Sequence, residues 1–530
     1  MSDDRLCDWQ IHIATAAVKR HQPELFANDP VYGESGLWRH HTPAMQAAME
    51  LVLVPGGYED PTMPFRAMAG VAVMAYLCGM YALLYRQCRT WSIPVLVAVL
   101  SCAVVATPGG SLWGIGSLAS VTPAGLCLAI SPLILLAFLR YQRRWQLLLV
   151  FGFVGLLGNL HLASATNLAL VLLIAYLGRR RFALRAWPMA IGCAAMAVAA
   201  GTPYLFYFLS LRRSLGPAGA AASYTAAYQA LKGLEVLYPD LLKSLLEWDL
   251  LIRVLVLAVA AAVVLLRVER FRVRSIGLWV WLVAASVLVA YGLQGASQLI
   301  GWLRHTAPPV IDFVQASALV MLPLYVLFAQ ALTNLFRLSG RHRKSLRWAC
   351  AVMLAAWLLP TDNLRIARHA VYDGYDAIMR RTEKAEEPRT VRRHQLQQAR
   401  HAELAVIAQW ARTQSDQKAA FIIDRADFRM MARRAIVASD EDARAFYYMS
   451  PSRLEAWDEQ VTREKALLKG PIDPESLRRF VADLSGSEEW EGVPAWYVVV
   501  TAGVAPGDGA MMREVLSPGW GRHYRLYRLP

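Results

Sequence analysis

The stretch QLLLVFGFVGLLGNLHLASATNLALVLLIAYL, residues 146–177, decides the fold because it is almost wholly apolar and yet has arginine-rich sequence on both flanks. A single straight span would place those basic flanks on opposite sides of a membrane. Gly158, Asn159 and His161 interrupt the stretch near its middle. We therefore predict two short helices that enter and return, each about 15 residues or roughly 22 Å long. The tip with Asn159 and His161 is expected at membrane depth, facing a cavity.

Outward from this hairpin, apolar runs recur through the first two thirds of the chain. The composition is 56% hydrophobic and the mean hydropathy is +0.32, which is typical of a polytopic membrane protein. With the hairpin counted as two, we predict about ten membrane segments. The others are Ala67–Tyr85, Ser92–Thr107, Thr122–Leu139, Trp187–Leu209, Leu250–Leu266, Ile276–Leu293, Val310–Phe336 and Trp348–Pro360.

The net charge of +15 is not spread evenly along the chain. From residue 362 onward 26 Lys and Arg face 25 Asp and Glu, so the excess lies elsewhere. It lies in five short loops that hold 18 Lys and Arg and one acid, Glu269: these are 86–89, 140–144, 179–185, 267–274 and 337–347. Such loops are typical of the cytoplasmic side of a membrane protein, so we predict no nucleic-acid partner.

If the basic loops are cytoplasmic, both ends of the chain lie on the opposite side. The predicted domains are a first extracytoplasmic loop with amphipathic helices (1–66), a transmembrane helical domain (67–361), a charged linker or stalk (362–402) and an extracytoplasmic α/β domain (403–530). An external N-terminus needs a preceding helix to carry it across the membrane, so we expect one further transmembrane segment upstream of residue 1. The seven cysteines form no CxxC or Cys/His ligand pattern.

The C-terminal region alternates helical and strand-like patterns, which predicts a small, largely parallel sheet. The expected strands are Ala419–Ile423, Ala435–Ala438, Trp496–Thr501 and His523–Leu529, with helices between them. A glycine-rich phosphate loop, a GxSxG motif and an HExxH motif are all missing from this region of the sequence. We expect a structural or substrate-binding role rather than an independent active site.

The polar stretch Asp8–Pro30 precedes the apolar part of the chain. Asp8 and His12 are four residues apart and would share one helix face. Asp29 follows at a turn bounded by Pro30. Two carboxylates and an imidazole can perform acid/base chemistry or bind a divalent cation. For each feature a purely structural alternative stays open: the helix is a solvated amphipathic helix, and Asp29 only fixes the turn before Pro30.

The plan of the chain resembles that of the GT-C superfamily of integral-membrane glycosyltransferases. The sequence DWQIH from Asp8 to His12 is similar to the DxYYH-like start of prokaryotic oligosaccharyltransferase subunits. The segments LFANDPVYG, NLHLASATNLAL, PPVIDFVQA and DFRMMARRAIV look like those of a group of bacterial polytopic proteins with such a body and tail. A WWDxG motif is missing, which sets the chain apart from the oligosaccharyltransferases themselves.

The resemblance implies a bacterial inner-membrane glycosyltransferase that takes sugar from a polyprenyl-phosphate-linked donor to an envelope acceptor on the periplasmic side. Asp8, with His12 and Asp29 nearby, would be the catalytic group. The partners are then the lipid bilayer and the lipid-linked sugar. The alternative is a non-catalytic protein for translocation or assembly of envelope polysaccharide or lipid. Metal dependence and oligomeric state stay open.

Two further sets of residues are candidates within this scheme. Donor phosphate would contact basic side chains in the external segments, namely Arg39, His40, His41, Arg304 and His305. For the first three, simple attraction to lipid headgroups is the alternative. Asn159, His161 and Asp312 are polar groups predicted to face the cavity. For Asn159 and His161, hydrogen bonding between helices would also explain their position.

Overall fold

The structure is a computed structural model that describes part of the chain. It describes residues 6, 8–55, 60–106, 112–115, 118–141, 143–215, 223–231, 276–308, 311–337, 348, 351–352, 389–469, 472–487, 490–502, 512–515 and 519–529. Two predicted membrane segments lie outside this part of the chain: all of Leu250–Leu266, and Trp348–Pro360 apart from residues 348, 351 and 352.

Apolar helices form the membrane part of the protein. They are α3 (Met63–Cys88), α4 (Ser92–Ser101), α5 (Pro123–Arg140), α6 (Arg144–Leu157), α7 (Leu162–Arg179), α8 (Trp187–Leu215), α12 (Ile276–Val287), α13 (Gln294–Leu303) and α14 (Met321–Arg337). A π-helical turn, Leu288–Leu293, joins α12 to α13, and a 3₁₀ helix, η5 (Phe313–Val320), leads into α14. Aliphatic and aromatic side chains from these helices, except α13, share one core.

Six helical stretches within the described ranges are long and apolar enough to cross a membrane: Met63–Cys88, Pro123–Arg140, Leu162–Arg179, Leu184–Ser214, Gly277–Leu303 and Phe313–Asn334. The chain is therefore a multi-pass membrane protein. Ten segments are not confirmed, because α4 has only 10 residues and α6 only 14. After α4 the chain forms a small antiparallel pair, β1 (Val105–Ala106) and β2 (Leu112–Trp113), where the sequence had suggested a longer helix.

Helices α6, α7 and α8 alternate in direction. A Cβ atom on Gly155 of α6 would lie 2.1 Å from the Ala197 carbonyl oxygen of α8, while Leu148 lies near Gly192, so α6 and α8 are parallel and their backbones touch. Leu177, at the end of α7, packs against Ala186 and Ala190 at the beginning of α8. The chain therefore turns back between Leu157 and Leu162, and the arginine-rich flanks of the quoted stretch lie at the same end of the bundle.

Described residues of other helices lie at this same end, which we call the basic end. Arg86, near the end of α3, donates a hydrogen bond to the Leu139 carbonyl near the end of α5, at 3.2 Å. Gln330 of α14 contacts Gln87 of α3 at 3.4 Å. Phe182, between α7 and α8, packs edge-on against Trp281 near the start of α12.

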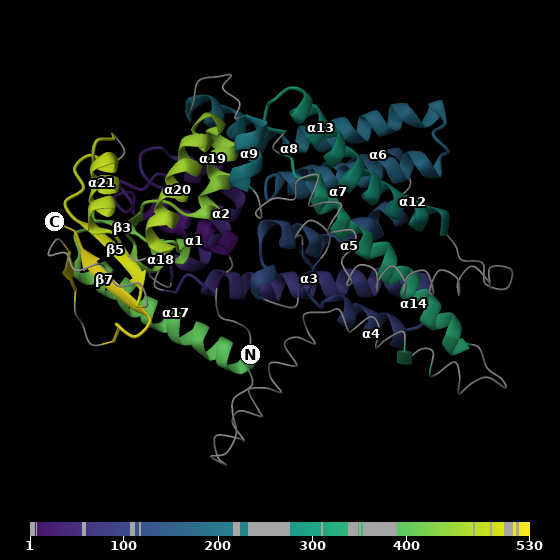
Figure 1. Cartoon of the computed structure of the whole chain (residues 1–530). Coiled ribbons are helices and arrows are strands. Elements are labelled where there is room, and N and C mark those ends of the chain that lie inside the picture. Colours follow the sequence, from purple (N-terminus) through teal and green to yellow (C-terminus); the bar gives the residue numbers. More distant parts are fainter. Residues whose placement is uncertain are drawn as a thin grey trace, which may run out of the picture.

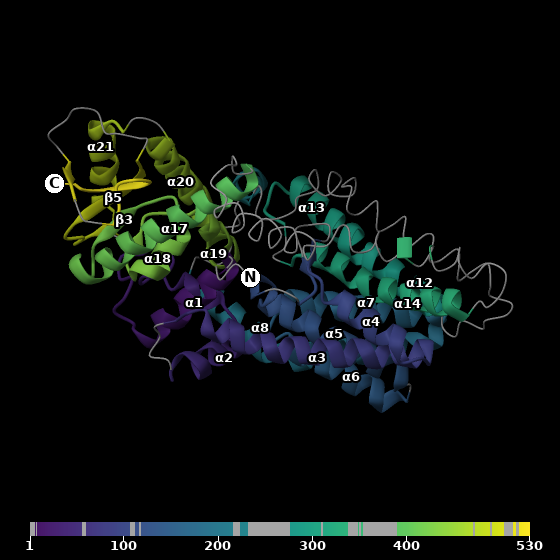
Figure 2. The same ribbon diagram turned by 90° about the horizontal axis from the view of Figure 1, so that it is seen from below.

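The opposite end, which we call the cap end, holds both polar parts of the chain (Figure 1). The N-terminal part forms α1 (Asp8–His21), the 3₁₀ helix η1 (Leu37–His40) and α2 (Pro43–Leu53). Figures 1 and 2 show α1 between the C-terminal sheet domain and the helix bundle, with α2 beside the beginning of α3. One hydrophobic core runs through this segment and one face of the sheet.

The C-terminal domain is built on a five-stranded sheet of order β4-β3-β5-β7-β6. Its strands are β3 (Ala420–Ile422), β4 (Ala435–Ile436), β5 (Trp496–Thr501), β6 (Arg513–Glu514) and β7 (Tyr524–Arg528). The pairs β3–β4 and β3–β5 are parallel, whereas β5–β7 and β6–β7 are antiparallel. The sheet is therefore mixed rather than largely parallel, because after β5 the chain continues to the edge strand β6 and turns back into β7, which is antiparallel to both.

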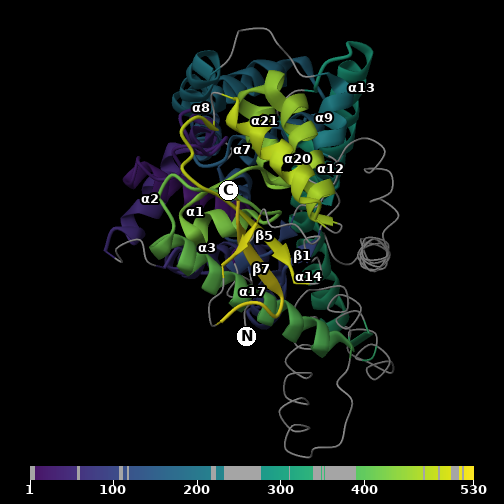
Figure 3. The same cartoon turned by 60° about the vertical axis from the view of Figure 1, so that its left-hand side comes forward.

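Helices cover this sheet on both faces (Figure 3). Helix α17 (Arg389–Gln414) packs on one face, and it runs without a break through the predicted boundary between residues 402 and 403. The remaining helices are α18 (Ala426–Ala432), α19 (Ala443–Met449), α20 (Leu454–Lys469) and α21 (Pro474–Ser485). A short helix between the bundle and the C-terminal domain, α9 (Tyr224–Leu231), contacts α19 and α20.

Candidate functional site

Helix α1 is held between the two halves of the molecule and is not a solvated amphipathic helix. Residues 10–19 are all buried. The side chain of Gln10 donates hydrogen bonds to the carbonyls of Leu118 (2.7 Å) and Val121 (3.0 Å), just before α5 begins. Small residues on the helix, among them Ala14 and Ala17, let its neighbours approach closely. The helix is thereby fixed against the cap end of the bundle.

Asp8 is the first residue of α1, and the structure describes its backbone but not its side chain. The adjoining Trp9 packs beneath the guanidinium of Arg444, which lies 4.4 Å from the indole centroid. Arg444 belongs to α19 of the C-terminal domain. The first turn of α1 therefore meets a cation from a segment more than four hundred residues away, which the sequence analysis did not single out.

His12, one turn further on, is buried beside Tyr32. Its Nδ1 lies 2.8 Å from the Tyr32 hydroxyl, and that hydroxyl lies 3.2 Å from the His12 carbonyl. Both contacts form together when Nδ1–H donates to Tyr32 and Tyr32 donates to the carbonyl. In this arrangement Nε2 carries a lone pair, and it is buried without a hydrogen-bond partner. His12 therefore presents a free acceptor inside the protein.

His40 and His41 form a second imidazole pair in the same region, with ring centroids 4.0 Å apart. His40 Nδ1 donates to the Leu37 carbonyl at 2.8 Å, and His41 Nε2 is buried without a partner. Burial lowers the pKa of His40 to about 4, and burial with the neighbouring imidazoles lowers the pKa of His41 well below its ordinary value. Burial and the charges of Arg429, His40 and Arg444 do the same to the pKa of His12. All three are neutral bases near pH 7.

These pKa shifts predict that acid lowers the stability of the cap end. An unfolded imidazole binds a proton as the pH falls below about 6.5, whereas folded His40 does so only near pH 4, so stability declines as the pH falls through this window. We expect the melting temperature to drop between pH 7.5 and pH 5.0, and the drop to be about 1–3 °C smaller in His40→Gln. Differential scanning fluorimetry measures both, with the exposed His21→Gln as the matched control. An identical drop in His40→Gln and wild type would contradict this assignment.

The segment that carries the histidine pair is tied to the bundle. The hydroxyl groups of Tyr204 and Tyr207 in α8 donate to the carbonyls of His40 (2.9 Å) and Arg39 (3.0 Å). Thr42 donates to the Leu160 carbonyl, at the tip between α6 and α7, at 2.9 Å. The Arg39 side chain is exposed, with its guanidinium 5.7 Å from the Trp38 ring centroid. Arg39 can therefore reach an anion at the surface while its backbone stays fixed.

Asn159 forms side-chain hydrogen bonds to the backbone of α8 at an interruption of that helix. Pro203 lies inside α8 and disturbs the regular hydrogen bonding there. Asn159 Oδ1 accepts from the Tyr204 N–H (3.1 Å), and its Nδ2 donates to the Ala200 carbonyl (3.1 Å), so the amide is inserted between a donor and an acceptor that would otherwise bond to each other. This geometry agrees with the helix-to-helix hydrogen-bonding role considered for Asn159.

His161 and Asp312 belong to one chain of polar contacts at the cap end. His161 caps α7 and contacts the Ser164 hydroxyl through Nδ1 at 2.8 Å. Ser164 donates to Gln315 (3.3 Å), and Gln315 donates to Asp312 Oδ2 (3.0 Å). Asp312 also caps η5 by accepting from the Val314 N–H at 3.1 Å.

Burial raises the pKa of Asp312, while its hydrogen bonds and the positive charge of Arg444 act against that rise. Arg444 thus influences Asp312 at the end of a membrane helix, and it also covers Trp9 at the start of α1. Arg444 thus places a positive charge of the C-terminal domain close to both the N-terminal segment and the bundle.

Arg304 and His305 lie apart from this cluster. Both are exposed at the end of α13, and His305 adopts a left-handed backbone conformation (φ 54°). Neither side chain forms a hydrogen bond or an ion pair in the described part of the protein. The structure therefore brings together His12, His40 and His41, but it does not join Arg304 and His305 to them.

Asp29 lies in a buried ion cluster between the N-terminal segment and the C-terminal domain. Its Oδ2 accepts from Arg429 Nε at 2.6 Å, and its Oδ1 accepts from the backbone N–H groups of Val31 and Tyr32, both at 3.0 Å. The Arg429 guanidinium also forms two 2.9 Å hydrogen bonds to Asp442. Although burial acts to lower it, the two carboxylates raise the pKa of Arg429 above its ordinary value. With its oxygens engaged in this way, Asp29 fits the turn-fixing role.

No family model matches the chain, and a search of curated proteins finds no match. Within the described ranges, no group of three or more His, Cys, Asp or Glu side chains is arranged to hold a metal ion. The protein is thus defined as a multi-pass membrane protein whose buried N-terminal helix lies between the helix bundle and a small mixed-sheet domain.

Proposed function

We propose that this protein is a GT-C-like glycosyltransferase that transfers sugar from a polyprenyl-phosphate-linked donor to an envelope acceptor. The observation that carries the proposal is the position of α1: its first turn, which begins with Asp8, meets Arg444 at the cap end of the bundle. A lipid-linked donor would arrive through the bilayer at this level, and a hydrophilic acceptor would arrive from outside it.

In the proposed reaction Asp8 takes the proton of the acceptor hydroxyl as general base. The hydroxyl oxygen then bonds to the anomeric carbon of the donor sugar, while the bond from that carbon to the phosphate oxygen breaks. The lipid phosphate leaves with the bonding electrons. Arg444 and the exposed Arg39 provide positive charge that stabilises that anion.

The proposed location is the bacterial inner membrane with the cap end outside the cytoplasm. The positive-inside bias of the loops supports this orientation, because α3, α5 and α7 all end in arginine-bearing turns at the basic end. A polyprenyl-phosphate donor would therefore be used on the periplasmic side.

This orientation predicts which positions react with an impermeant reagent. In a cysteine-free version of the full chain, single cysteines at the exposed positions Arg20 and Arg522 should react with a membrane-impermeant maleimide in intact spheroplasts. A cysteine at the exposed Arg180, at the basic end, should react only after lysis. Labelling of Arg180→Cys in intact spheroplasts, or its absence at the other two positions, would overturn the orientation.

The transfer reaction is tested by profiling envelope glycans and lipid-linked sugars in a deletion strain. Loss of the protein should remove one glycan modification and cause one polyprenyl-phosphate sugar to accumulate, and the wild-type gene should reverse both changes. Accumulation of a completed glycan on the wrong side of the membrane, with its sugar composition unchanged, would instead indicate translocation and would reject the transferase.

A further inference from the structure

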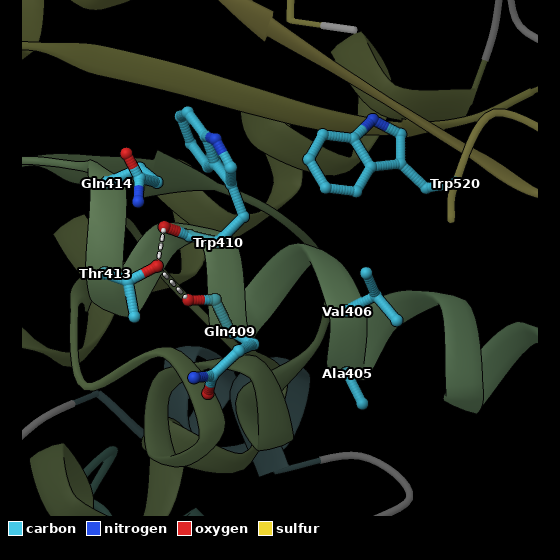
Figure 4. A pocket seen from close by; sticks show the side chains of 7 residues that line it. All are labelled: Ala405, Val406, Gln409, Trp410, Thr413, Gln414 and Trp520. Carbon is cyan, nitrogen blue, oxygen red and sulfur yellow. Dashed lines mark hydrogen bonds between the residues drawn. The ribbon is translucent and has the colours of Figure 1, made fainter. Parts of the chain in front are cut away.

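The outer face of the C-terminal domain carries a solvent-open hollow of about 570 Å³ that is separate from the cap-end site. Helix α17 forms its floor, and Trp520, from the segment that precedes β7, forms one wall (Figure 4). Its lining residues are Ala405, Val406, Gln409, Trp410, Thr413, Gln414 and Trp520. We call it the tryptophan hollow.

Two indole rings give the hollow its shape. The Trp410 and Trp520 rings lie 6.1 Å apart between centroids and meet at 73°. Trp410 also packs edge-on against Tyr497 of β5, and Trp520 is fixed by an indole N–H donation of 3.2 Å to the Val515 carbonyl. Both rings are therefore held in place before any ligand arrives.

The remaining lining carries no charge and combines the apolar Ala405 and Val406 with the polar Gln409, Thr413 and Gln414. The side-chain amides of Gln409 and Gln414 are exposed and form no hydrogen bond within the described residues. The Thr413 hydroxyl donates to the carbonyls of Gln409 and Trp410, which leaves its oxygen able to accept (Figure 4). The lining thus offers no ionised side chain with which a charged ligand could pair.

We propose that the tryptophan hollow binds an uncharged oligosaccharide. A pyranose ring has an apolar C–H face, which packs against an indole, and an edge of hydroxyl groups, which exchange hydrogen bonds with amides. Two indoles that meet at a wide angle match two sugar rings of a bent oligosaccharide better than they match a ligand with a flat aliphatic surface. The assignment concerns binding alone, so it holds whether or not the cap-end site transfers sugar.

The proposal is tested by saturation-transfer-difference NMR on the full chain with maltohexaose, cellohexaose and chitohexaose as separate probes. The protein is kept in lauryldimethylamine oxide, because maltoside detergents would compete for the hollow. At least one probe should bind with a dissociation constant on the order of 10⁻⁴ M. Trp520→Ala should weaken that binding at least tenfold and Gln409→Ala about threefold.

Leu396→Ala is the matched control, because Leu396 is 40% exposed on the same helix but lies outside the hollow. It should bind the probe as the wild type does. Gln409 is exposed and makes no core contact, so its variant tests the hollow even if Trp520→Ala lowers stability. Failure of all three probes to bind, or equal binding by wild type and both hollow variants, would overturn the proposal. Loss of self-association in Trp520→Ala without loss of sugar binding would likewise assign the face to a second copy of the chain and overturn it.

Discussion

Replacing Arg429 with leucine should lower the free energy of unfolding by about 3–5 kcal/mol. The side chain of Arg429 is 1% exposed and those of Asp29 and Asp442 are fully buried, so the substitution leaves two carboxylates facing each other in an apolar core. Neither can be rehydrated without separating the N-terminal segment from the C-terminal domain. Thermal unfolding of the purified full chain measures the effect, and a fall in melting temperature well beyond the usual effect of a surface substitution is expected.

The matched control is Arg463→Leu. Arg463 pairs with Asp483 at 2.6 Å, but the two side chains are 48% and 60% exposed, so its loss should cost about 0–1 kcal/mol. Adding Asp29→Asn and Asp442→Asn to Arg429→Leu removes the stranded charges and should recover part of the stability. Equal losses for Arg429→Leu and Arg463→Leu would show that burial of the cluster does not govern its contribution.

The cluster also explains how the cap-end site keeps its geometry. Arg429 lies in α18, and Asp29 lies 400 positions earlier in the turn that carries Tyr32. Tyr32 packs under the Arg429 guanidinium at 5.1 Å and contacts His12. A chain of contacts from Arg429 through Tyr32 to His12 therefore connects the C-terminal sheet domain to α1. Weakening the ion cluster should release His12 from its position.

The sequence predicted the features that arise from local pattern. Apolar windows located α3, α5 and α8, and the conflict between apolar length and basic flanks located the turn between α6 and α7. These predictions succeed because a helix of 18 or more residues repeats its signal over several turns. Strands β3, β4, β5 and β7 were located for a similar reason, since buried strands are short, continuous apolar runs.

The contacts between distant segments could not be predicted in this way. Helix α19 is only seven residues long, which is too short for a helical hydrophobic period to be recognised in the sequence. Arg444 was therefore not predicted as a site residue. The burial of α1 depends on surfaces supplied by α18, α2 and the start of α5, and composition alone suggested a solvated helix. Pairing of Asp29 with Arg429 likewise requires knowing the tertiary arrangement. The sequence thus proposed a site at the first turn of α1 but could not identify the distant segments that surround this turn.

In the proposed transferase reaction, replacing Asp8 with asparagine should reduce the rate of sugar transfer by about 10²–10⁴-fold. Asn cannot accept the acceptor's proton, whereas a carboxylate at this position can act as the general base. The melting temperature should stay near that of the wild type, because the substitution keeps the shape of the side chain. Transfer is measured with membranes of the deletion strain that express either protein, using the polyprenyl-phosphate sugar that the strain accumulates.

The comparison with Glu24→Gln and Arg444→Leu separates the possible roles of Asp8. Glu24 is an exposed acid of the same segment, so its variant should transfer sugar at the wild-type rate. Arg444→Leu should raise the KM for the lipid-linked donor, because it removes the cation beside Trp9. Asp8→Asn should instead lower kcat and remove the acidic limb of the pH–rate profile, since that limb reports protonation of the base. A full rate for Asp8→Asn with normal donor turnover would exclude Asp8 as the base and leave the imidazole of His12, with its free Nε2, as the group to test next.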